Sequence, residues 1–391
     1  HPNKVYCHKI NGRKITFLEL EHYVNKCCRF FEETGVGFNE VVNISIPNSI
    51  SFIVLYFAGL RSGIKVNPCP STLSENELIK NINFVESKLL ITQKLIDADN
   101  IPGNCSYLKF NDDDDFLLQL ETYTDKKYER EIYSDDVACI YYSSGTTDDP
   151  KCVLYSHKNM FSLTKSIVND FQFLSESIHL GVLPLGHTAI TNYQLLPSLY
   201  AGSTLFLAEN FNSVRGDIWK IIADLNITYL QVVPTILFSM MATPYDEKDV
   251  RSNQSLKYIG CGSAPLSIES QINFHNRFDV KVANLYGLSE TGPSHFDNPL
   301  LPDWRPGSIG YPLTVNECKI FNKDLDEVKD GEIGQIGLKG DNVFVGYYKN
   351  KKAYKKSFFN DYFLTRDLGY KDATGKYYFV DREKDLIIKA G

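Results

Sequence analysis

The chain has 391 residues, of which 43% are hydrophobic and 23% are charged, a composition typical of soluble globular proteins. This length exceeds what one hydrophobic core usually supports, so the sequence predicts two or more subdomains. The net charge of -7 and the pI of about 5.7 argue against a general nucleic-acid-binding or anionic-membrane surface.

The cysteine pattern and the hydropathy indicate the cellular setting. Nine cysteines are scattered along the chain without a Cys-x-x-Cys pair, and their number is odd. A reduced, cytoplasmic protein fits this pattern better than a disulfide-rich secreted one. The longest apolar stretch, Ile50–Leu60, is too short to cross a bilayer, so no transmembrane segment is expected.

Strand-like and helix-like segments alternate through the first three quarters of the chain. Ser74-Glu-Asn-Glu77 is a capping box that opens a helix ending near Glu86. Strands separated by helices indicate parallel sheets with right-handed crossovers. The other expected elements are, in order, Val41–Ile46, Ser49–Arg61, Lys88–Thr92, Val137–Tyr142, Asn159–Asp170, Leu180–Leu183, Thr191–Leu199, Thr204–Ala208, Asp217–Leu225, Tyr229–Val233, Thr235–Met241, Leu256–Gly260, Ile268–Arg277 and Val280–Leu285.

After about Pro293 the pattern changes to short strands joined by Gly/Asp turns. It predicts a small, mostly antiparallel β subdomain at about 294–380, beside α/β subdomains at about 1–290. Asp112–Asp115, a run of four carboxylates, is interpreted as a solvated loop rather than a metal site. The expected strands of this region are Cys318–Phe321, Glu332–Leu338, Tyr362–Leu364 and Tyr377–Val380.

One loop combines hydroxyls, a glycine and a lysine at the end of a predicted strand. It runs Ser143-Ser-Gly-Thr-Thr-Asp-Asp-Pro-Lys-Cys152. Consecutive backbone N–H groups in such a loop can bind an anion, and Lys151 adds a positive charge on a long stem. The spacing is not that of a P-loop NTPase. The loop alone is equally typical of a Ser/Thr-rich surface loop.

Further segments along the chain remove that ambiguity. These segments are, in chain order, Pro47-Asn48, Leu60-Arg-Ser-Gly63, Leu183-Pro-Leu-Gly-His187, Val233-Pro-Thr235, Gly262-Ser-Ala-Pro-Leu266, Tyr286-Gly-Leu-Ser-Glu-Thr291, Pro306-Gly-Ser-Ile-Gly310, Gly331-Glu-Ile-Gly334, Gly346-Tyr-Tyr348, Thr365-Arg-Asp367 and Asp381-Arg-Glu-Lys-Asp385. Together with the loop, and in this order, they resemble the adenylate-forming superfamily of acyl-CoA synthetases, firefly-type luciferases and peptide-synthetase adenylation domains, and are closest to acyl-CoA ligases.

The resemblance implies a nucleotide site that holds ATP and Mg²⁺. Tyr286 would lie against the adenine, Asp367 would accept hydrogen bonds from the ribose, and Arg382 would hold the ribose or phosphate side. Glu290 would bind Mg²⁺ with Thr147, since a hard cation neutralises departing pyrophosphate. The other implied nucleotide-binding residues are Ser143, Ser144, Gly145, Thr146, Thr147, Lys151, Gly262, Ser263, Ala264, Gly287 and Ser289.

The resemblance also implies a site for the acid that is activated. His187 matches the residue that gates the acyl pocket, and it is expected to act with Lys151 and Glu290 in catalysis. Cys152 and Cys261 would lie near the nucleotide and the acyl group, so a thiol alkylator is expected to inhibit and ATP to protect. The expected lining residues are His187, Ile190, Tyr193, Val233, Gly260, Cys261 and Gly262.

Three residues stand where the family usually has glycine: Asp148, Cys152 and Arg366. The charge of Asp148 near the triphosphate path could cost on the order of 1 kcal/mol. Lys384 matches the hinge, so residues 1–380 are expected to form the large domain and 381–391 the hinge. The family's mobile C-terminal domain is then absent from this sequence.

The sequence therefore predicts an α/β ligase that converts a carboxylic acid and ATP into acyl-AMP and pyrophosphate. Coenzyme A is the expected acceptor, with a fatty or aryl acid as substrate. A non-catalytic nucleotide or acyl-adenylate binder is the alternative of another class. Luciferase and amino-acid adenylation remain alternatives within the superfamily, although Thr188–Tyr193 offers no carboxylate for a substrate amine.

Overall fold

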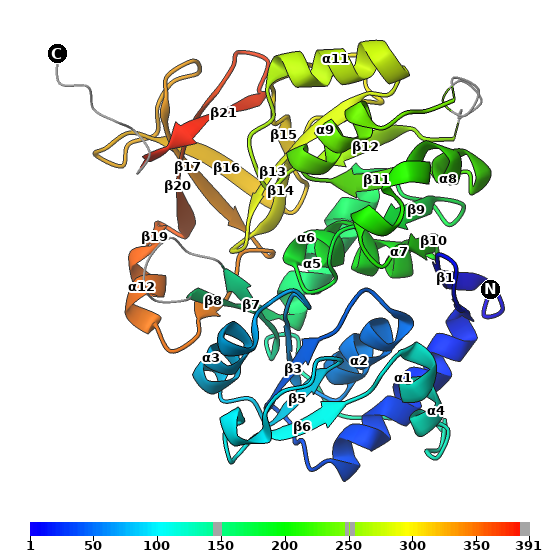
Figure 1. Ribbon diagram of the computed structural model, residues 1–391. Coiled ribbons are helices and arrows are strands. Elements are labelled where there is room, and N and C mark those ends of the chain that lie inside the picture. The colour runs from blue at the N-terminus through cyan, green and yellow to red at the C-terminus, as the bar shows by residue number, and fades with distance from the viewer. Residues whose placement is uncertain (144–150, 247–249, 251–254, 384–391) are drawn as a thin grey trace.

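The computed structural model describes residues 1–143, 151–246, 250 and 255–383. Within these residues, three β-sheets carry the architecture: one of seven strands, one of nine and one of five (Figure 1). The two larger sheets are mostly parallel and flanked by helices, and the smallest is antiparallel. The fold class predicted from the sequence is confirmed.

The seven-stranded sheet forms the half of the molecule that contains most of the N-terminal segment (Figure 1). Helices α1 (Phe17–Glu33) and α2 (Ile50–Arg61) pack on one of its faces, and α3 (Glu75–Val85) packs on the other. The predicted capping box of α3 is present. The strand order is β18 (Gly346–Tyr347), β8 (Lys151–Ser156), β7 (Val137–Ser143), β4 (Lys65–Pro68), β3 (Val41–Ser45), β5 (Leu89–Thr92) and β6 (Ser106–Lys109).

The nine-stranded sheet has a buried cluster on each face. One cluster is covered by α8 (Ile218–Asp224), α9 (Pro234–Ala242) and α11 (Ile268–Phe278), and the other by α5 (His157–Asp170). The strand order is β15 (Tyr311–Pro312), β14 (Gly292–Phe296), β13 (Val282–Leu288), β12 (Tyr258–Cys261), β11 (Tyr229–Val232), β9 (Ile178–Gly181), β10 (Thr204–Leu207), β1 (Val5–Lys9) and β2 (Lys14–Thr16).

The antiparallel sheet lies beside the carboxyl end of β13, where Tyr286 packs with Ile320 and Ile336 (Figure 1). Because β14, β15 and β18 join the other sheets, residues 294–380 contribute to all three sheets rather than to one. This sheet contains β16 (Asn316–Phe321), β17 (Gly334–Gly340), β20 (Tyr362–Lys371), β19 (Phe358–Phe359) and β21 (Tyr377–Arg382).

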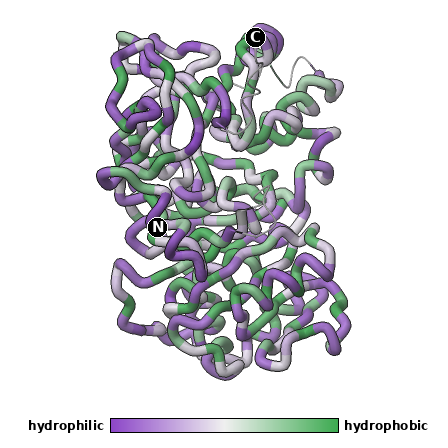
Figure 2. Tube along the Cα trace, turned by 90° about the vertical axis from the view of Figure 1, so that its left-hand side faces the viewer, coloured by the Kyte–Doolittle hydropathy of each residue, from purple (hydrophilic) through white to green (hydrophobic). Residues whose placement is uncertain are grey.

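A buried ion pair links the antiparallel sheet to the nine-stranded sheet. Lys376, in the turn between β20 and β21, donates to Asp297 Oδ1 at 2.7 Å, and both side chains are almost fully buried. The same ammonium also contacts the backbone carbonyl of Asp303. Figure 2 shows hydrophobic stretches running through both halves of the molecule and hydrophilic stretches on the outer turns.

The run Asp112–Asp115 opens a helix instead of forming a solvated loop. Asp112 caps α4 (Asp113–Leu120) by accepting from the backbone N–H of Asp115. Asp113 is buried, and it accepts from the backbone N–H groups of Ile50 and Ser51 at the start of α2. Carboxylates at helix N-termini satisfy otherwise unpaired donors, so this part of the interpretation was wrong.

The remaining helices are short, and they connect the larger elements. A turn at Thr191–Leu195 has π-helical hydrogen bonding, a form often found near functional sites. No helix in the described part of the chain is long and apolar enough to cross a membrane. The short helices are α6 (Thr188–Ile190), α7 (Leu196–Ala201) and α12 (Lys351–Lys356).

Candidate active site

Two residues predicted to hold the adenosine are hydrogen-bonded to each other. Tyr286, on β13, donates its hydroxyl to Asp367 Oδ2 on β20 at 2.8 Å, and both side chains are buried. Burial, followed by the negative charge of Asp367, raises the pKa of the Tyr286 phenol. The phenol therefore stays neutral and remains a donor, which fixes the orientation of the carboxylate.

Arg382 reaches the same carboxylate from β21. Asp367 and Arg382 are partners in the β20–β21 ladder, and Arg382 Nε lies 3.4 Å from Asp367 Oδ1. The Arg382 side chain is about half exposed, whereas that of Asp367 is almost fully buried. The structure thus places three predicted nucleotide residues, which lie far apart in sequence, in one connected group.

A bulge in β20 presents Asp367. On β17, Gln335 pairs with Leu368 and Gly337 pairs with Leu364 of β20. The single residue Ile336 therefore lies opposite residues 365–367. Thr365 donates its hydroxyl to the backbone carbonyl of Ile336, and its oxygen accepts from the N–H of Asp367 at 3.1 Å. Arg366, at the middle of the bulge, has a φ of 62° and is exposed.

Glu290 and Lys151, predicted to act on the phosphates, meet at Tyr347. The Tyr347 hydroxyl donates to Glu290 Oε1 at 2.7 Å, and Lys151 Nζ lies 5.6 Å from the centre of the Tyr347 ring. Glu290 lies in the turn between β13 and β14, Lys151 begins β8 and Tyr347 is on β18. A positive and a negative group from two sheets therefore face one aromatic ring.

The turn that carries Ser289 and Glu290 is held in place by contacts from several elements. The Tyr155 hydroxyl donates to the backbone carbonyl of Ser289 at 2.8 Å. The backbone N–H of Phe344 donates to the backbone carbonyl of Glu290 at 2.9 Å. Gly287 has no room for a side chain, because an added Cβ would come within 2.3 Å of the carbonyl oxygen of Gly292. The backbones of β13 and β14 can approach this closely only with glycine there.

Gly262, Ser263 and Ala264 form the loop that leaves β12. Gly262 is buried, and an added Cβ would lie 3.0 Å from the backbone oxygen of Leu285. Ser263 has a φ of 68°, and both Ser263 and Ala264 are exposed. Small side chains thus line an open edge next to β13, as expected for residues that admit a flat base.

His187 lies immediately before α6 and is exposed. The protein atoms around its imidazole lower the pKa of that group by desolvation, which favours the neutral form at physiological pH. The hydroxyl of Thr191 donates to the backbone carbonyl of His187 at 3.2 Å. The expected gate residue is therefore available to a ligand but has no carboxylate partner among the described contacts.

The predicted acyl-lining residues do not share one wall. Tyr193 packs in the cluster that also contains Tyr229, whereas Cys261 packs in the cluster on the opposite face of the nine-stranded sheet. Ile190 belongs to the core beneath α1 and α2, and Val233 is partly buried against that core. The predicted acyl-lining residues are thus spread over several packing clusters, and their role toward the acid stays a prediction.

The space beside Gly260 is occupied by a polar pair. Tyr229 donates its hydroxyl to Gln231 Oε1 at 2.6 Å, and both side chains are buried. An added Cβ on Gly260 would lie 2.5 Å from the Tyr229 hydroxyl oxygen and 2.3 Å from Gln231 Oε1. Glycine at this position therefore makes room for two side chains of the chain itself.

The two cysteines expected near the site are poorly reactive in the folded protein. Cys152 and Cys261 are buried, and burial raises the pKa of each thiol to about 12. Because the thiolate is the nucleophile, alkylation of the native protein at these positions should be slow. This burial argues against the expected inhibition by thiol alkylators, which stays a prediction.

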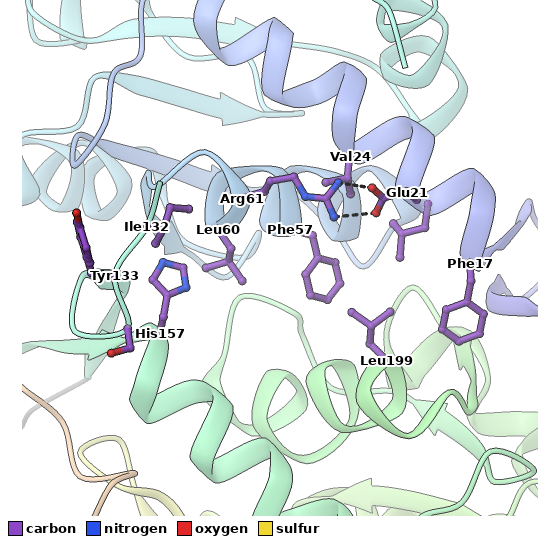
Figure 3. A pocket seen from close by; sticks show the side chains of 12 residues that line it. Phe17, Glu21, Val24, Phe57, Leu60, Arg61, Ile132, Tyr133, His157 and Leu199 are labelled. Carbon is purple, nitrogen blue, oxygen red and sulfur yellow. Dashed lines mark hydrogen bonds and ion pairs between the residues drawn. The ribbon is translucent and has the colours of Figure 1, made fainter. Parts of the chain in front are cut away.

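A cavity of about 650 Å³ lies elsewhere, between α1, α2 and α7 (Figure 3). Arg61 and Glu21 pair across its wall through hydrogen bonds of 2.8 and 2.7 Å, and Phe57 and Leu199 line it with apolar surface. None of the residues predicted for the nucleotide or the acid lines this cavity.

Several predicted site residues lie outside the described residues or are only partly described. Ser144, Gly145, Thr146, Thr147 and Lys384 fall outside them, and Ser143 is described only as the last residue of β7. Tyr347 was not predicted as a site residue. The segment Gly346-Tyr-Tyr348 gave the signal, but only the tertiary structure links it to Glu290.

Comparison with known proteins identifies the family of the chain. The sequence profile described as AMP-binding enzyme matches residues 1–348. A sulfoacetate–CoA ligase from Cupriavidus necator is 28% identical over 97% of this chain and 75% of its own length. A 2-succinylbenzoate–CoA ligase from Bacillus licheniformis is 30% identical over 97% of this chain and 76% of its own length.

Similarity to solved structures extends along almost the whole chain. The ATP-bound crystal structure of MatB from Rhodopseudomonas palustris superimposes with a TM-score of 0.91 at 25% identity. That match covers 99% of this chain and 77% of the other. The profile, the relatives and the fold lead to one assignment: the chain belongs to the AMP-binding enzyme family, as an AMP-forming carboxylate–CoA ligase.

Proposed function

We propose that the connected groups around Asp367 and Glu290 activate a carboxylic acid with ATP. The observation that carries the proposal is the convergence of Tyr286, Asp367 and Arg382 on one side and of Glu290 and Lys151 on the other. An oxygen of the acid attacks the α-phosphorus, and the bond to the β-phosphate oxygen breaks. Pyrophosphate leaves with that electron pair, and acyl-AMP remains.

In this proposal the adenosine is held by the first group. Asp367 accepts hydrogen bonds from the ribose hydroxyls, with Tyr286 fixing the carboxylate from behind. Arg382, at 3.4 Å from Asp367 Oδ1 and half exposed, can turn toward a phosphate while the ribose takes its place. Holding the nucleotide in one geometry lowers the entropic cost of the reaction.

The second group neutralises the departing pyrophosphate. Lys151 supplies a positive charge, and Glu290 offers carboxylate oxygens, the ligand type that Mg²⁺ prefers. No cluster of three or more His, Cys, Asp or Glu side chains in the described residues could hold a metal by itself. One carboxylate plus substrate phosphates is a usual set of ligands for Mg²⁺, so Glu290 fits a metal that arrives with ATP.

In the second half-reaction, the thiol of coenzyme A attacks the acyl carbon and AMP departs. The acids in the names of the relatives differ, so they do not identify the acid of this chain. Fatty and aryl acids stay the predicted classes, with His187 at the entrance to the acyl site. A cytoplasmic location is supported by nine free thiols.

The non-catalytic alternative loses part of its support. Cys152, which stands where the family has glycine, packs with Val41, Val85 and Ile140, whereas Lys151 faces Tyr347. Successive residues of a strand point to opposite faces, so the thiol does not crowd the lysine. Asp148 lies outside the described residues and remains a sequence-based reason for this alternative.

The test is ATP–pyrophosphate exchange on the complete protein with fatty, aryl, dicarboxylic and amino acids, followed by detection of the CoA thioester. We expect exchange with one class of acid and thioester formation when coenzyme A is added. Binding of ATP without exchange for any acid would instead support the non-catalytic binder.

A further inference from the structure

Arg366 is an unusual residue for its backbone conformation. Its φ of 62° lies in the left-handed region, which favours glycine over residues with a Cβ. It stands at the centre of the β20 bulge, directly before Asp367. Glycine would relieve this backbone conformation, and the position of the arginine beside Asp367 makes its side chain a candidate for a role in the site.

The surroundings of Arg366 suggest that explanation. It is exposed, and its guanidinium makes no hydrogen bond or ion pair with any residue that the structure describes. Burial and then the charge of Glu290 raise the pKa of the Tyr347 phenol, and the positive charge of Arg366 opposes that shift. The Phe344 ring lies 4.7 Å from that of Tyr347 and 5.3 Å from that of Phe363, three residues before Arg366 on β20. This part of β20 therefore passes close to the ring that receives Lys151 and donates to Glu290.

We propose that Arg366 binds the polyphosphate of ATP and the pyrophosphate product, as a phosphate ligand that works alongside Lys151. The inference rests on the proposed function of the site. Its chain neighbour Asp367 is assigned to the ribose, and Glu290, across Tyr347, is assigned to the metal on the phosphates. In this proposal the exposed guanidinium of Arg366 extends from its place beside Asp367 to the phosphates, which lie between the ribose and the metal. Its planar donors match phosphate oxygens in pairs, and a single ammonium cannot do this.

The experiment compares three variants of the complete protein by equilibrium binding. Arg366→Gly removes the guanidinium and relieves the backbone, Arg366→Asn tolerates a positive φ without the charge, and Arg366→Lys keeps the charge without the paired donors. Affinities are measured for inorganic pyrophosphate, MgATP and AMP. Lys349→Gly is the matched control, because Lys349 is also a cation with a positive φ, but its ammonium pairs with Glu86 at 2.8 Å.

We expect Arg366→Gly and Arg366→Asn to weaken pyrophosphate and MgATP binding by about 10- to 100-fold. AMP binding should change by less than about twofold, and the melting temperature of Arg366→Gly should not fall, because glycine relieves the strain. Arg366→Lys should lie between wild type and Arg366→Gly, and Lys349→Gly should match wild type.

Two outcomes would overturn the inference. Unchanged affinities for pyrophosphate and MgATP would show that Arg366 does not touch the phosphates. An equal loss for AMP and pyrophosphate would show that the residue only shapes the bulge that presents Asp367. These binding measurements test the role of Arg366 independently of the proposed function. The proposed function fails only if the wild-type protein exchanges no pyrophosphate with any acid.

Discussion

The Tyr286 hydroxyl and Asp367 Oδ2 lie 2.8 Å apart, although 81 residues separate them in the chain. Tyr286 belongs to the nine-stranded sheet and Asp367 to the antiparallel one. This hydrogen bond joins the two halves of the proposed adenosine site. A shift of either sheet would misplace the base-binding ring and the ribose-binding carboxylate together.

Asp367→Asn should reduce the preference for a ribose. In the wild-type protein we expect ATP to bind about tenfold more tightly than 2′-deoxy-ATP, because the deoxy sugar lacks the 2′-hydroxyl that donates to the charged carboxylate. Asp367→Asn should bring the two affinities within about threefold, as calorimetric titration of both nucleotides would show. Tyr286→Phe should keep most of the preference, so an equal effect of both substitutions would argue against direct ribose binding.

Glu290→Gln should impair the chemical step and its metal dependence. Loss of one group that neutralises charge in the transition state typically costs about 10²- to 10³-fold in rate. Pyrophosphate exchange measured across a Mg²⁺ titration should show this loss and a higher Mg²⁺ requirement. Tyr347→Phe keeps the carboxylate of Glu290, so it should reduce the exchange rate less. An equal loss of rate in the two variants would show that Glu290 acts through Tyr347 and not on the metal.

Lys376→Met should destabilise the fold strongly. The substitution leaves the buried carboxylate of Asp297 unpaired, which typically costs about 3–5 kcal/mol. Lys371→Met is the matched control, since Lys371 pairs with Asp330 at 2.9 Å on the surface, where such pairs contribute about 0–1 kcal/mol. Urea denaturation of the three proteins measures the difference, and similar midpoints for the two variants would contradict the assigned role.

Acid should destabilise the protein through buried histidines. Burial lowers the pKa of His295 and of His179 to about 3 each, so both stay neutral in the folded state while the unfolded chain takes up protons near pH 6.5. Their contribution is present above about pH 6.5 and is lost as the pH falls toward 3, by up to about 1.4 kcal/mol per pH unit for each group.

Chemical denaturation at pH 7, 6 and 5 checks this dependence. His295→Gln should reduce the slope of stability against pH, even if it lowers stability at pH 7. A variant that keeps the full wild-type slope would show that other groups, such as the carboxylates, dominate the acid response.

Local chemistry made much of the fold predictable. The alternation of strands and helices from Val41 to Leu285 is confirmed, and so is the capping box at Ser74 and Glu77. Strand β8 was missed because it follows the hydroxyl loop directly. The N-terminal elements β1, β2 and α1 were not predicted either. Strand β1 pairs with β10, about 200 residues later, whereas the capping box of Thr16 and Glu19 was a local signal for α1 that was missed.

The ordered motifs named the family, the reaction and most of the proposed nucleotide residues, because each motif carries its chemistry in a short stretch of residues. The sequence by itself could also mark Arg366 as a departure from glycine. Only the tertiary structure decided that β20 passes close to Tyr347 just before Arg366, that Tyr347 donates to Glu290, and that Cys261 and Tyr193 pack in different clusters. These relations depend on the pairing of strands from three sheets and on which face of a strand each side chain occupies, and neither is encoded in any local stretch of the chain.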